Sequence, residues 1–191
     1  MLKNSSLDFF VKKQQGNDKM SRQLWLLRHG KSDRNLAVDD YDRPLKKRGK
    51  KAAERMGVWL KNENLIPDYL ISSPAKRAYM TAKFVHKAFA EETVDIVQDK
   101  RLYQEGFERL KTVLAECPPE AKRVLMVGHN PELEDLLVNL VGVNNLPDVE
   151  RLLSTATLVR LTMSDDWTYL EAGCATLVGI TRAKLLPEEN L

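Results

Sequence analysis

Short runs of apolar residues alternate along the chain with longer segments in which apolar residues recur every three or four positions. The apolar runs at 24–27, 69–71 and 124–127 are short and are followed by polar residues, a pattern typical of strands buried on both faces. The segment 47–62 has its apolar side chains at helical spacing, which indicates a helix with one apolar face. This alternation predicts an α/β fold, a three-layer α/β/α sandwich around a mostly parallel sheet.

The remaining predicted helices have recognisable capping residues. Ser73 is a candidate N-cap, and Pro74 a candidate first-turn residue, for a helix that runs to residue 90. Asn130 and Pro131 repeat this arrangement before another helix. The other predicted elements are a helix at 107–116, a short strand at 94–97 and closing strands at 157–163, 168–171 and 175–180.

The composition is that of an ordinary globular protein. The 191 residues are 43% hydrophobic and 30% charged, and the formal net charge is +3. No apolar stretch reaches the roughly 20 residues that span a bilayer, and so small a positive charge does not indicate nucleic-acid binding. The two cysteines, Cys117 and Cys174, are far apart in the sequence, which argues against a disulfide framework and suits a reducing cytoplasm.

The N-terminal residues differ from the rest of the chain. Residues 1–21 are mostly polar and are expected to form a flexible extension, followed by a single domain at 22–191. They have no signal-peptide pattern, which favours a cytoplasmic location. Met20 stands just before the first predicted strand and is a candidate start of translation, a hypothesis that the intact mass of the native protein tests.

Arginine and histidine residues follow the three strongest strand signals. Arg28 and His29 come directly after the first strand, Arg77 lies in the first turn of the helix after the second, and His129 follows the third. The carboxyl ends of parallel strands meet at one edge of a sheet, where helix N-termini also present free N–H groups. We therefore expect the two arginines and two histidines to converge on one site that suits a phosphate group.

These motifs resemble those of the histidine phosphatase superfamily, which contains the phosphoglycerate mutases and related phosphatases. The resemblance covers residues 22–186 and rests on three blocks in the order of the family, Arg28-His29-Gly30, Ser73-Pro74 through Arg77 with Thr81-Ala82, and Gly128-His129. Within the superfamily the chain is most similar to the SixA-type phosphohistidine phosphatases, through Lys31-Ser32, Asp42-Arg43-Pro44-Leu45 with Arg48-Gly49, Leu102-Tyr103, and Asn130-Pro131 with Leu133-Glu134. The resemblance implies a phosphoglycerate mutase-like fold and phosphatase activity.

The resemblance also implies a role for each site residue. His29 would attack phosphorus through a neutral ring nitrogen and form a phosphohistidine intermediate. The planar guanidinium groups of Arg28 and Arg77 would bind phosphoryl oxygens, and their charge favours the neutral histidine ring. His129 would donate a further hydrogen bond to the phosphoryl group. Two more residues occupy phosphate-contacting positions of the family motif, Ser32 and Asn35.

The acid that protonates the leaving oxygen of an ester in related enzymes has no clear counterpart. The chain has Gln104 near the matching position and Glu105 one residue further on. An imidazole leaving group is protonated near neutral pH, whereas an alcohol leaving group needs a proton from the enzyme. The sequence therefore favours phosphohistidine in a protein as the substrate.

Two alternatives remain open. In the first, Glu105 turns into the site and acts as the general acid of a phosphomonoesterase on small phosphorylated metabolites. In the second, the chain is a noncatalytic phosphate-binding regulatory domain, although the presence of both histidines and both arginines argues against it. Mutase activity is disfavoured because the stretch 97–107 is short for a substrate cover. The mechanism needs no metal or other cofactor, and neither nucleic acid nor a membrane is an expected partner.

Basic residues cluster where the helix at 47–62 begins. They are Lys46, Lys47, Arg48, Lys50 and Lys51. Such a cluster is typical of a solvated helix face, and the alternative interpretation is a docking surface for an acidic phosphoprotein.

Overall fold

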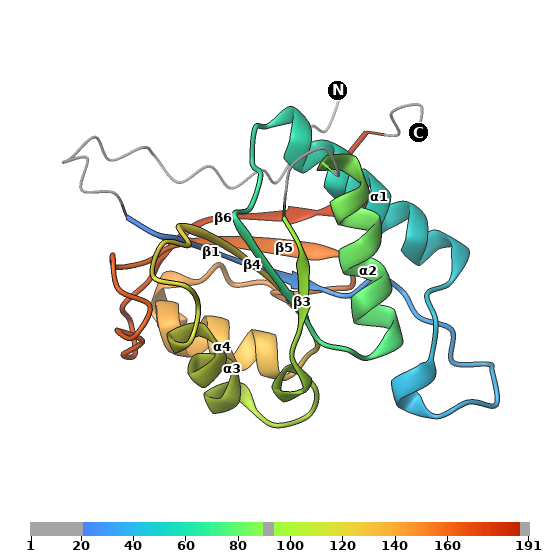
Figure 1. The fold of residues 1–191 in the computed structure, drawn as a ribbon, viewed down its shortest axis with the longest axis horizontal. Coiled ribbons are helices and arrows are strands. Elements are labelled where there is room, and N and C mark those ends of the chain that lie inside the picture. Colours follow the sequence, from blue (N-terminus) through green and yellow to red (C-terminus); the bar gives the residue numbers. More distant parts are fainter. Residues whose placement is uncertain (1–20, 90–93, 188–191) are drawn as a thin grey trace.

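A six-stranded sheet forms the centre of the computed structural model, which describes residues 21–89 and 94–187 (Figure 1). The strands are β1 (Gln23–Arg28), β2 (Tyr69–Ser72), β3 (Ile96–Gln98), β4 (Arg123–Gly128), β5 (Thr157–Thr162) and β6 (Thr176–Arg182). They lie in the order β3-β2-β4-β1-β5-β6. The first four strands run parallel to one another, whereas β5 is antiparallel to both of its neighbours, β1 and β6.

Two pairs of α-helices cover the two faces of this sheet (Figure 1). The helices are α1 (Lys47–Asn62), α2 (Lys76–His86), α3 (Phe107–Ala115) and α4 (Glu132–Val141). α1 contacts α2 over one face, and α3 contacts α4 over the other. Successive residues of β1 point to opposite faces, so Trp25 joins the apolar core beneath α1 and α2, and Leu26 joins the core beneath α3 and α4. The predicted α/β/α sandwich with a mostly parallel sheet is confirmed.

Short 3₁₀ helices join several of these elements. In the described ranges they are η1 (Asp40–Asp42), η2 (Lys87–Phe89), η3 (Lys100–Leu102), η4 (Val143–Asn145) and η5 (Ala183–Leu185). η1 matters most for function, because it lies in the loop between β1 and α1 and contacts α2.

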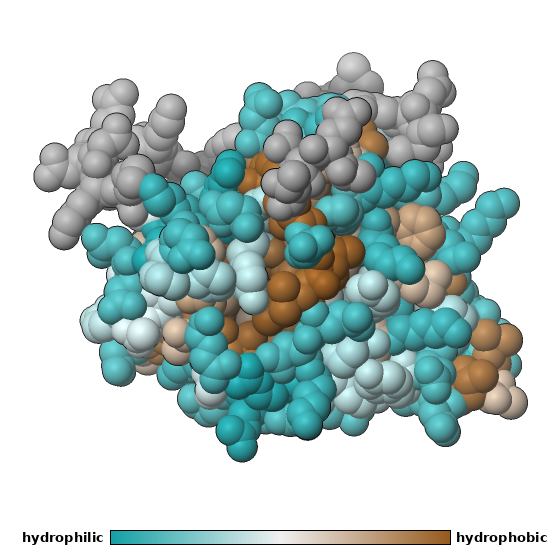
Figure 2. Space-filling model, in the orientation of Figure 1, coloured by the Kyte–Doolittle hydropathy of each residue, from teal (hydrophilic) through white to brown (hydrophobic). Residues whose placement is uncertain are grey.

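The surface in Figure 2 is mostly hydrophilic, with a band of apolar side chains across its centre over the region of β3. β3 is an edge strand, and two of its three side chains are exposed. In the core beneath α3 and α4, Cys117 is buried as a free thiol, whereas the free thiol of Cys174 is half-buried. None of the helices in the described ranges is long and apolar enough to cross a membrane.

Two helices begin later than their capping residues predict. The Ser73 hydroxyl accepts a hydrogen bond from the N–H of Ala75, which closes a turn in front of α2 rather than capping it. Asn130 does not cap α4, because its side-chain amide donates to the Glu134 carboxylate and to the carbonyl of Leu153. Both helices therefore begin after the proline of their predicted first turn.

The strand predicted at 168–171 is wrong: within the described residues this segment is a turn followed by residues without regular secondary structure. The Trp167 indole is buried and donates to the carbonyl of Ala121, and the Asp166 carboxylate accepts from the N–H of Thr168. These contacts turn the chain where the alternating sequence indicates a strand. The strand predicted at 94–97 is shifted toward the C-terminus because its pairing with β2 begins at Ile96. The helix predicted to run to residue 90 ends earlier, since α2 ends at His86 and η2 follows to Phe89. Residue 90 and the extension predicted at 1–21, apart from its last residue, lie outside the described residues.

Candidate active site

Three strand-to-helix junctions meet at the carboxyl edge of the sheet. β2, β4 and β1 are adjacent and parallel, so the residues that follow them lie side by side. The pairing continues past the strands, since the N–H of His29 donates to the carbonyl of Gly128 at 3.1 Å and the N–H of Ser73 donates to that of Val127 at 2.9 Å. His29, Ser73 and His129 are thereby brought next to one another.

Arg77 and the two histidine rings form a buried cluster at this edge. The ring centres of His29 and His129 are 5.1 Å apart. The Nε of Arg77 donates to Nε2 of His29 at 3.3 Å. All three side chains are buried, with at most 8% of any residue exposed. Three of the four residues expected to converge are therefore in one cluster.

The contacts of His29 define which nitrogen holds its proton. Nδ1 lies 2.7 Å from the carbonyl oxygen of Gly30, and Nε2 faces the Arg77 N–H. A carbonyl can only accept and a guanidinium can only donate, so a proton on Nδ1 satisfies both contacts. Gly30 is itself fixed, because its N–H donates to the Thr81 hydroxyl, which in turn donates to the carbonyl of Arg77. Nε2 is thus the unprotonated nitrogen.

His129 is oriented by Ser73. Its Nε2 lies 2.8 Å from the Ser73 hydroxyl, which already accepts a hydrogen bond from the N–H of Ala75. This hydroxyl can also donate to Nε2, and in that arrangement the ring carries its own proton on Nδ1. Nδ1 is buried and has no hydrogen-bond partner within the described part of the chain. An N–H group in this state can donate to an oxygen of a bound phosphoryl group.

Both rings are held neutral. Burial lowers the pKa of His29 to about 3, and the charges of Arg77 and Arg28 act in the same direction against the hydrogen bond to Gly30. Burial likewise lowers the pKa of His129 to about 2, helped by the proximity of His29 and Arg77. At neutral pH the lone pair of His29 Nε2 is therefore available.

We expect stability to fall steeply in mild acid because of these two rings. Their pKa values in the folded protein lie below the value of about 6.5 in an unfolded chain, so below pH 6.5 the unfolded chain binds protons that the folded one does not. Each ring should cost about 1.4 kcal/mol per pH unit between roughly pH 6 and pH 3. Urea unfolding at pH 7, 6 and 5 should give a shallower pH dependence for the His29→Asn/His129→Asn variant. Identical slopes would contradict the neutral state of the buried rings.

Asp40 is a residue of this site that the sequence analysis misses. Its carboxylate accepts a hydrogen bond from Arg77 at 2.9 Å and from the Tyr103 hydroxyl at 3.0 Å, and it also pairs with Arg43. Partial burial opposes the charge of this carboxylate, but the Tyr103 hydroxyl and the two arginines hold its pKa below the usual range. Tyr103 also packs edge-on against His129, with ring centres 5.4 Å apart. The Asp40 carboxylate, an anion of the protein itself, therefore accepts from one of the N–H donors of the Arg77 guanidinium.

Replacing Asp40 by asparagine is expected to tighten the binding of inorganic phosphate. The variant removes a carboxylate that competes for the Arg77 guanidinium, and because Asp40 itself is about half exposed we expect this pair to contribute about 0.2–1 kcal/mol. We expect the inhibition constant of phosphate to fall about 2- to 5-fold. Asp42→Asn, in the same 3₁₀ helix, is the matched control. Weaker phosphate inhibition in Asp40→Asn would instead mean that Asp40 serves mainly to orient Arg77.

The other predicted binding residues lie around this cluster. Arg28 donates to the carbonyl of Leu153 at 2.8 Å, and its buried Nε has no partner among the described residues. Ser32 is buried and its backbone bridges to Leu45, whereas Asn35 is exposed and its N–H donates to the carboxylate of Asp33. Arg28 and Ser32 are therefore close to His29 in the sequence, with Arg28 near enough to lower the pKa of His29, whereas Asn35 lies on the exposed loop.

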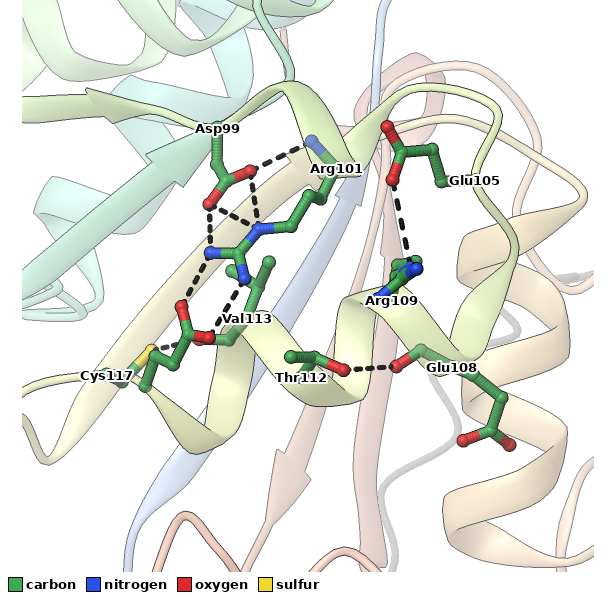
Figure 3. Close-up of polar contacts among 9 residues, drawn as sticks. Asp99, Arg101, Glu105, Glu108, Arg109, Thr112, Val113 and Cys117 are labelled. Carbon is green, nitrogen blue, oxygen red and sulfur yellow. Dashed lines mark hydrogen bonds and ion pairs between the residues drawn. The ribbon is translucent and has the colours of Figure 1, made fainter.

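Glu105 forms an ion pair with Arg109 rather than with Arg77. Figure 3 shows its carboxylate turned toward Arg109 on α3, with 3.9 Å between the carboxylate and Nε of Arg109. The side chain of Glu105 is 42% exposed. Gln104 has a positive φ of 59°, so the chain turns sharply between Tyr103, which faces the site, and Glu105.

Comparison with known proteins agrees with this geometry. Residues 24–111 match the model of the histidine phosphatase superfamily (branch 1). An uncharacterised protein of Mycobacterium tuberculosis is 28% identical over 160 residues, which cover 80% of this chain and 97% of that protein. A 2,3-bisphosphoglycerate-dependent phosphoglycerate mutase of Bifidobacterium longum is 33% identical, but only over 48% of this chain and 39% of the mutase.

Solved structures extend the similarity over most of the domain. A protein of Agrobacterium tumefaciens assigned as the phosphohistidine phosphatase SixA is 26% identical with a TM-score of 0.71, covering 84% of this chain and 97% of that one. The protein histidine phosphatase SixA in complex with tungstate has the same TM-score at 21% identity and shares the fold, covering 85% of this chain and 97% of that one.

Proposed function

We propose that the chain is a histidine phosphatase, in keeping with the match of residues 24–111 to the model of that superfamily, and that it hydrolyses phosphohistidine in a protein by way of a phosphorylated His29. The observation that carries the proposal is the state of this residue. Nε2 is unprotonated beside Arg77, while Nδ1 donates to the carbonyl of Gly30. This is the arrangement that in-line attack on phosphorus requires.

In the first step the lone pair of Nε2 attacks phosphorus. A nitrogen–phosphorus bond to His29 forms as the bond to the substrate imidazole breaks. Arg77, Arg28 and the Nδ1–H of His129 stabilise the phosphoryl oxygens. The substrate ring leaves as neutral imidazole once its other nitrogen is protonated, which happens near a pKa of about 6.5. The step exchanges one imidazole for another and needs no positioned acid.

In the second step water attacks the phosphorus of phospho-His29. An oxygen–phosphorus bond forms, the Nε2–phosphorus bond breaks, and the electron pair returns to Nε2. Because Nδ1 keeps its proton and donates it in a hydrogen bond to the Gly30 carbonyl, His29 leaves as a neutral ring. The proton lost by the water passes to the product phosphate or to solvent.

The position of Glu105 supports a phosphohistidine substrate. Its pairing with Arg109 leaves the described cluster without a carboxylic acid, since Asp40, with its pKa held below the usual range, is ionised. An alkoxide leaving group would lack a proton donor. The similarity to the Agrobacterium tumefaciens protein points in the same direction.

A substrate panel tests the proposal. Wild type, His29→Ala and Glu105→Gln should be compared on a phosphohistidine peptide, a phosphoserine peptide and a sugar phosphate, with and without a chelator. We expect wild type and Glu105→Gln to hydrolyse the phosphohistidine peptide equally, unaffected by the chelator, and His29→Ala to be inactive. Phosphate trapped on wild-type enzyme should be acid-labile and base-stable.

The same panel separates the alternatives. Faster hydrolysis of the sugar phosphate, lost in Glu105→Gln, would favour a phosphomonoesterase that recruits this carboxylate. Phosphate binding without turnover or trapped phosphoenzyme would favour a regulatory domain.

A further inference from the structure

A basic pocket lies beside the candidate active site. It has a volume of about 480 Å³. Its lining residues come from the loop after β1, from α1, from the loop before β5 and from η5: Lys31, Arg48, Lys51, Ala52, Arg55, Ser154, Thr155 and Lys184. Five of these eight carry a positive charge and none carries a negative one.

The pocket divides the basic cluster at the start of α1 into two groups. Arg48, Lys51 and Arg55 recur at spacings of three and four, so they share one face of the helix and line the pocket. Lys47 and Lys50 are exposed but do not line it. Lys46 instead pairs with Asp33 at 3.3 Å. The cluster is therefore more than a uniformly solvated face.

Most of the cations in the pocket have no internal counter-charge. Among residues 21–89 and 94–187, no carboxylate lies within 4 Å of the side-chain nitrogens of Lys31, Arg48, Lys51 or Lys184. Like charges gathered in one concavity repel one another and raise the local concentration of anions. Their arrangement is explained by an anionic partner.

Residues that line the pocket are connected through the backbone to His29. Lys31 follows His29 by two residues, and its carbonyl accepts a hydrogen bond from the N–H of Lys46 at the start of α1. Ser154 and Thr155, which also line the pocket, precede Ala156, whose N–H donates to the carbonyl of His29 at 3.2 Å. An anionic group in the pocket would therefore lie close to the phosphoryl group that His29 attacks.

We propose that this basic pocket binds acidic side chains of the phosphoprotein substrate, next to the phosphohistidine. This inference rests on the proposed function. Lys31, Arg48, Lys51 and Lys184 are exposed around the pocket, whereas sites for small ligands are mostly apolar and enclose their ligand. Long exposed cations suit several carboxylates on a mobile peptide, and they would act mainly on capture of the substrate rather than on the chemical step.

The test uses the double variant Arg48→Gln/Lys51→Gln with Lys47→Gln/Lys50→Gln as its matched control. Both remove two positive charges from α1, but only the first removes them from the pocket. The substrates are a phosphohistidine peptide flanked by aspartate and glutamate, the same peptide with asparagine and glutamine in their place, and phosphoramidate.

For the acidic peptide we expect the pocket variant to raise KM about 5- to 10-fold, because two exposed charge pairs with the peptide are lost, with kcat unchanged. The neutral peptide, phosphoramidate and the control variant should show changes below about 2-fold, and salt should reduce the difference between peptides. Equal loss on all three substrates, equal loss in the control, or no loss would overturn the proposal.

The proposed function can fail separately. If wild type hydrolyses phosphoramidate and forms phospho-His29 but does not distinguish the two peptides, the pocket proposal is wrong and the function stands. If wild type hydrolyses neither phosphoramidate nor the peptides, the function itself is wrong.

Discussion

Replacement of His29 by asparagine is expected to abolish phosphohistidine hydrolysis, with kcat reduced about 10⁴- to 10⁶-fold, as for the loss of other covalent nucleophiles. The asparagine amide can still donate to the carbonyl of Gly30, so the variant removes the lone pair of Nε2 while keeping a hydrogen-bond donor at this position. Initial rates on a phosphohistidine peptide and trapping of labelled phosphate measure the effect.

The control for this variant is ligand binding. Arg28, Arg77 and His129 remain, so His29→Asn should still bind inorganic phosphate within about 10-fold of wild type. Retention of more than a tenth of the wild-type kcat, together with normal phosphate binding, would mean that another group attacks phosphorus.

Replacement of Arg77 by lysine is expected to reduce kcat/KM about 10²- to 10³-fold, the usual cost of losing one preorganised contact to the developing charge. Arg77 uses different nitrogens to contact Nε2 of His29 and the carboxylate of Asp40. A lysine ammonium keeps the charge but has a single nitrogen and no planar fork.

Two readouts separate this effect from general damage. Lys76→Ala, at an exposed position in the same helical turn, should keep activity within about 2-fold, because surface substitutions of this kind are usually tolerated. Nitrogen NMR of His29 should report a changed environment of Nε2 only in Arg77→Lys. An activity loss of similar size in Lys76→Ala would assign the effect to the helix rather than to the guanidinium.

The strand-to-helix junctions of the site could be predicted from the sequence because their signals are local. A buried apolar run followed by a polar residue and a helical repeat indicates where a strand ends, and parallel strands bring such ends together. His29, Arg77 and His129 each follow such a run, and the structure brings their side chains into one cluster.

The remaining contacts could not be predicted, because they depend on tertiary structure. Asp40 meets Arg77 across 37 positions and Tyr103 across 63, and Ser73 meets His129 across 56. The direction of the Glu105 side chain follows a turn of the chain at Gln104. The positive φ of this residue is not specified by its type. Ser73 has the local sequence pattern of a helix cap, yet its hydroxyl forms a hydrogen bond with the ring of His129.

The chemistry proposed for the site also determines how the protein should respond to oxidants. Burial raises the pKa of the Cys117 thiol to about 12, and partial burial raises that of Cys174 as well. Peroxide attacks thiolates far faster than thiols, so both sulfurs are poor targets for sulfenic acid formation. A phosphatase whose nucleophile is an imidazole should thus keep its turnover in hydrogen peroxide that inactivates enzymes with a catalytic cysteine.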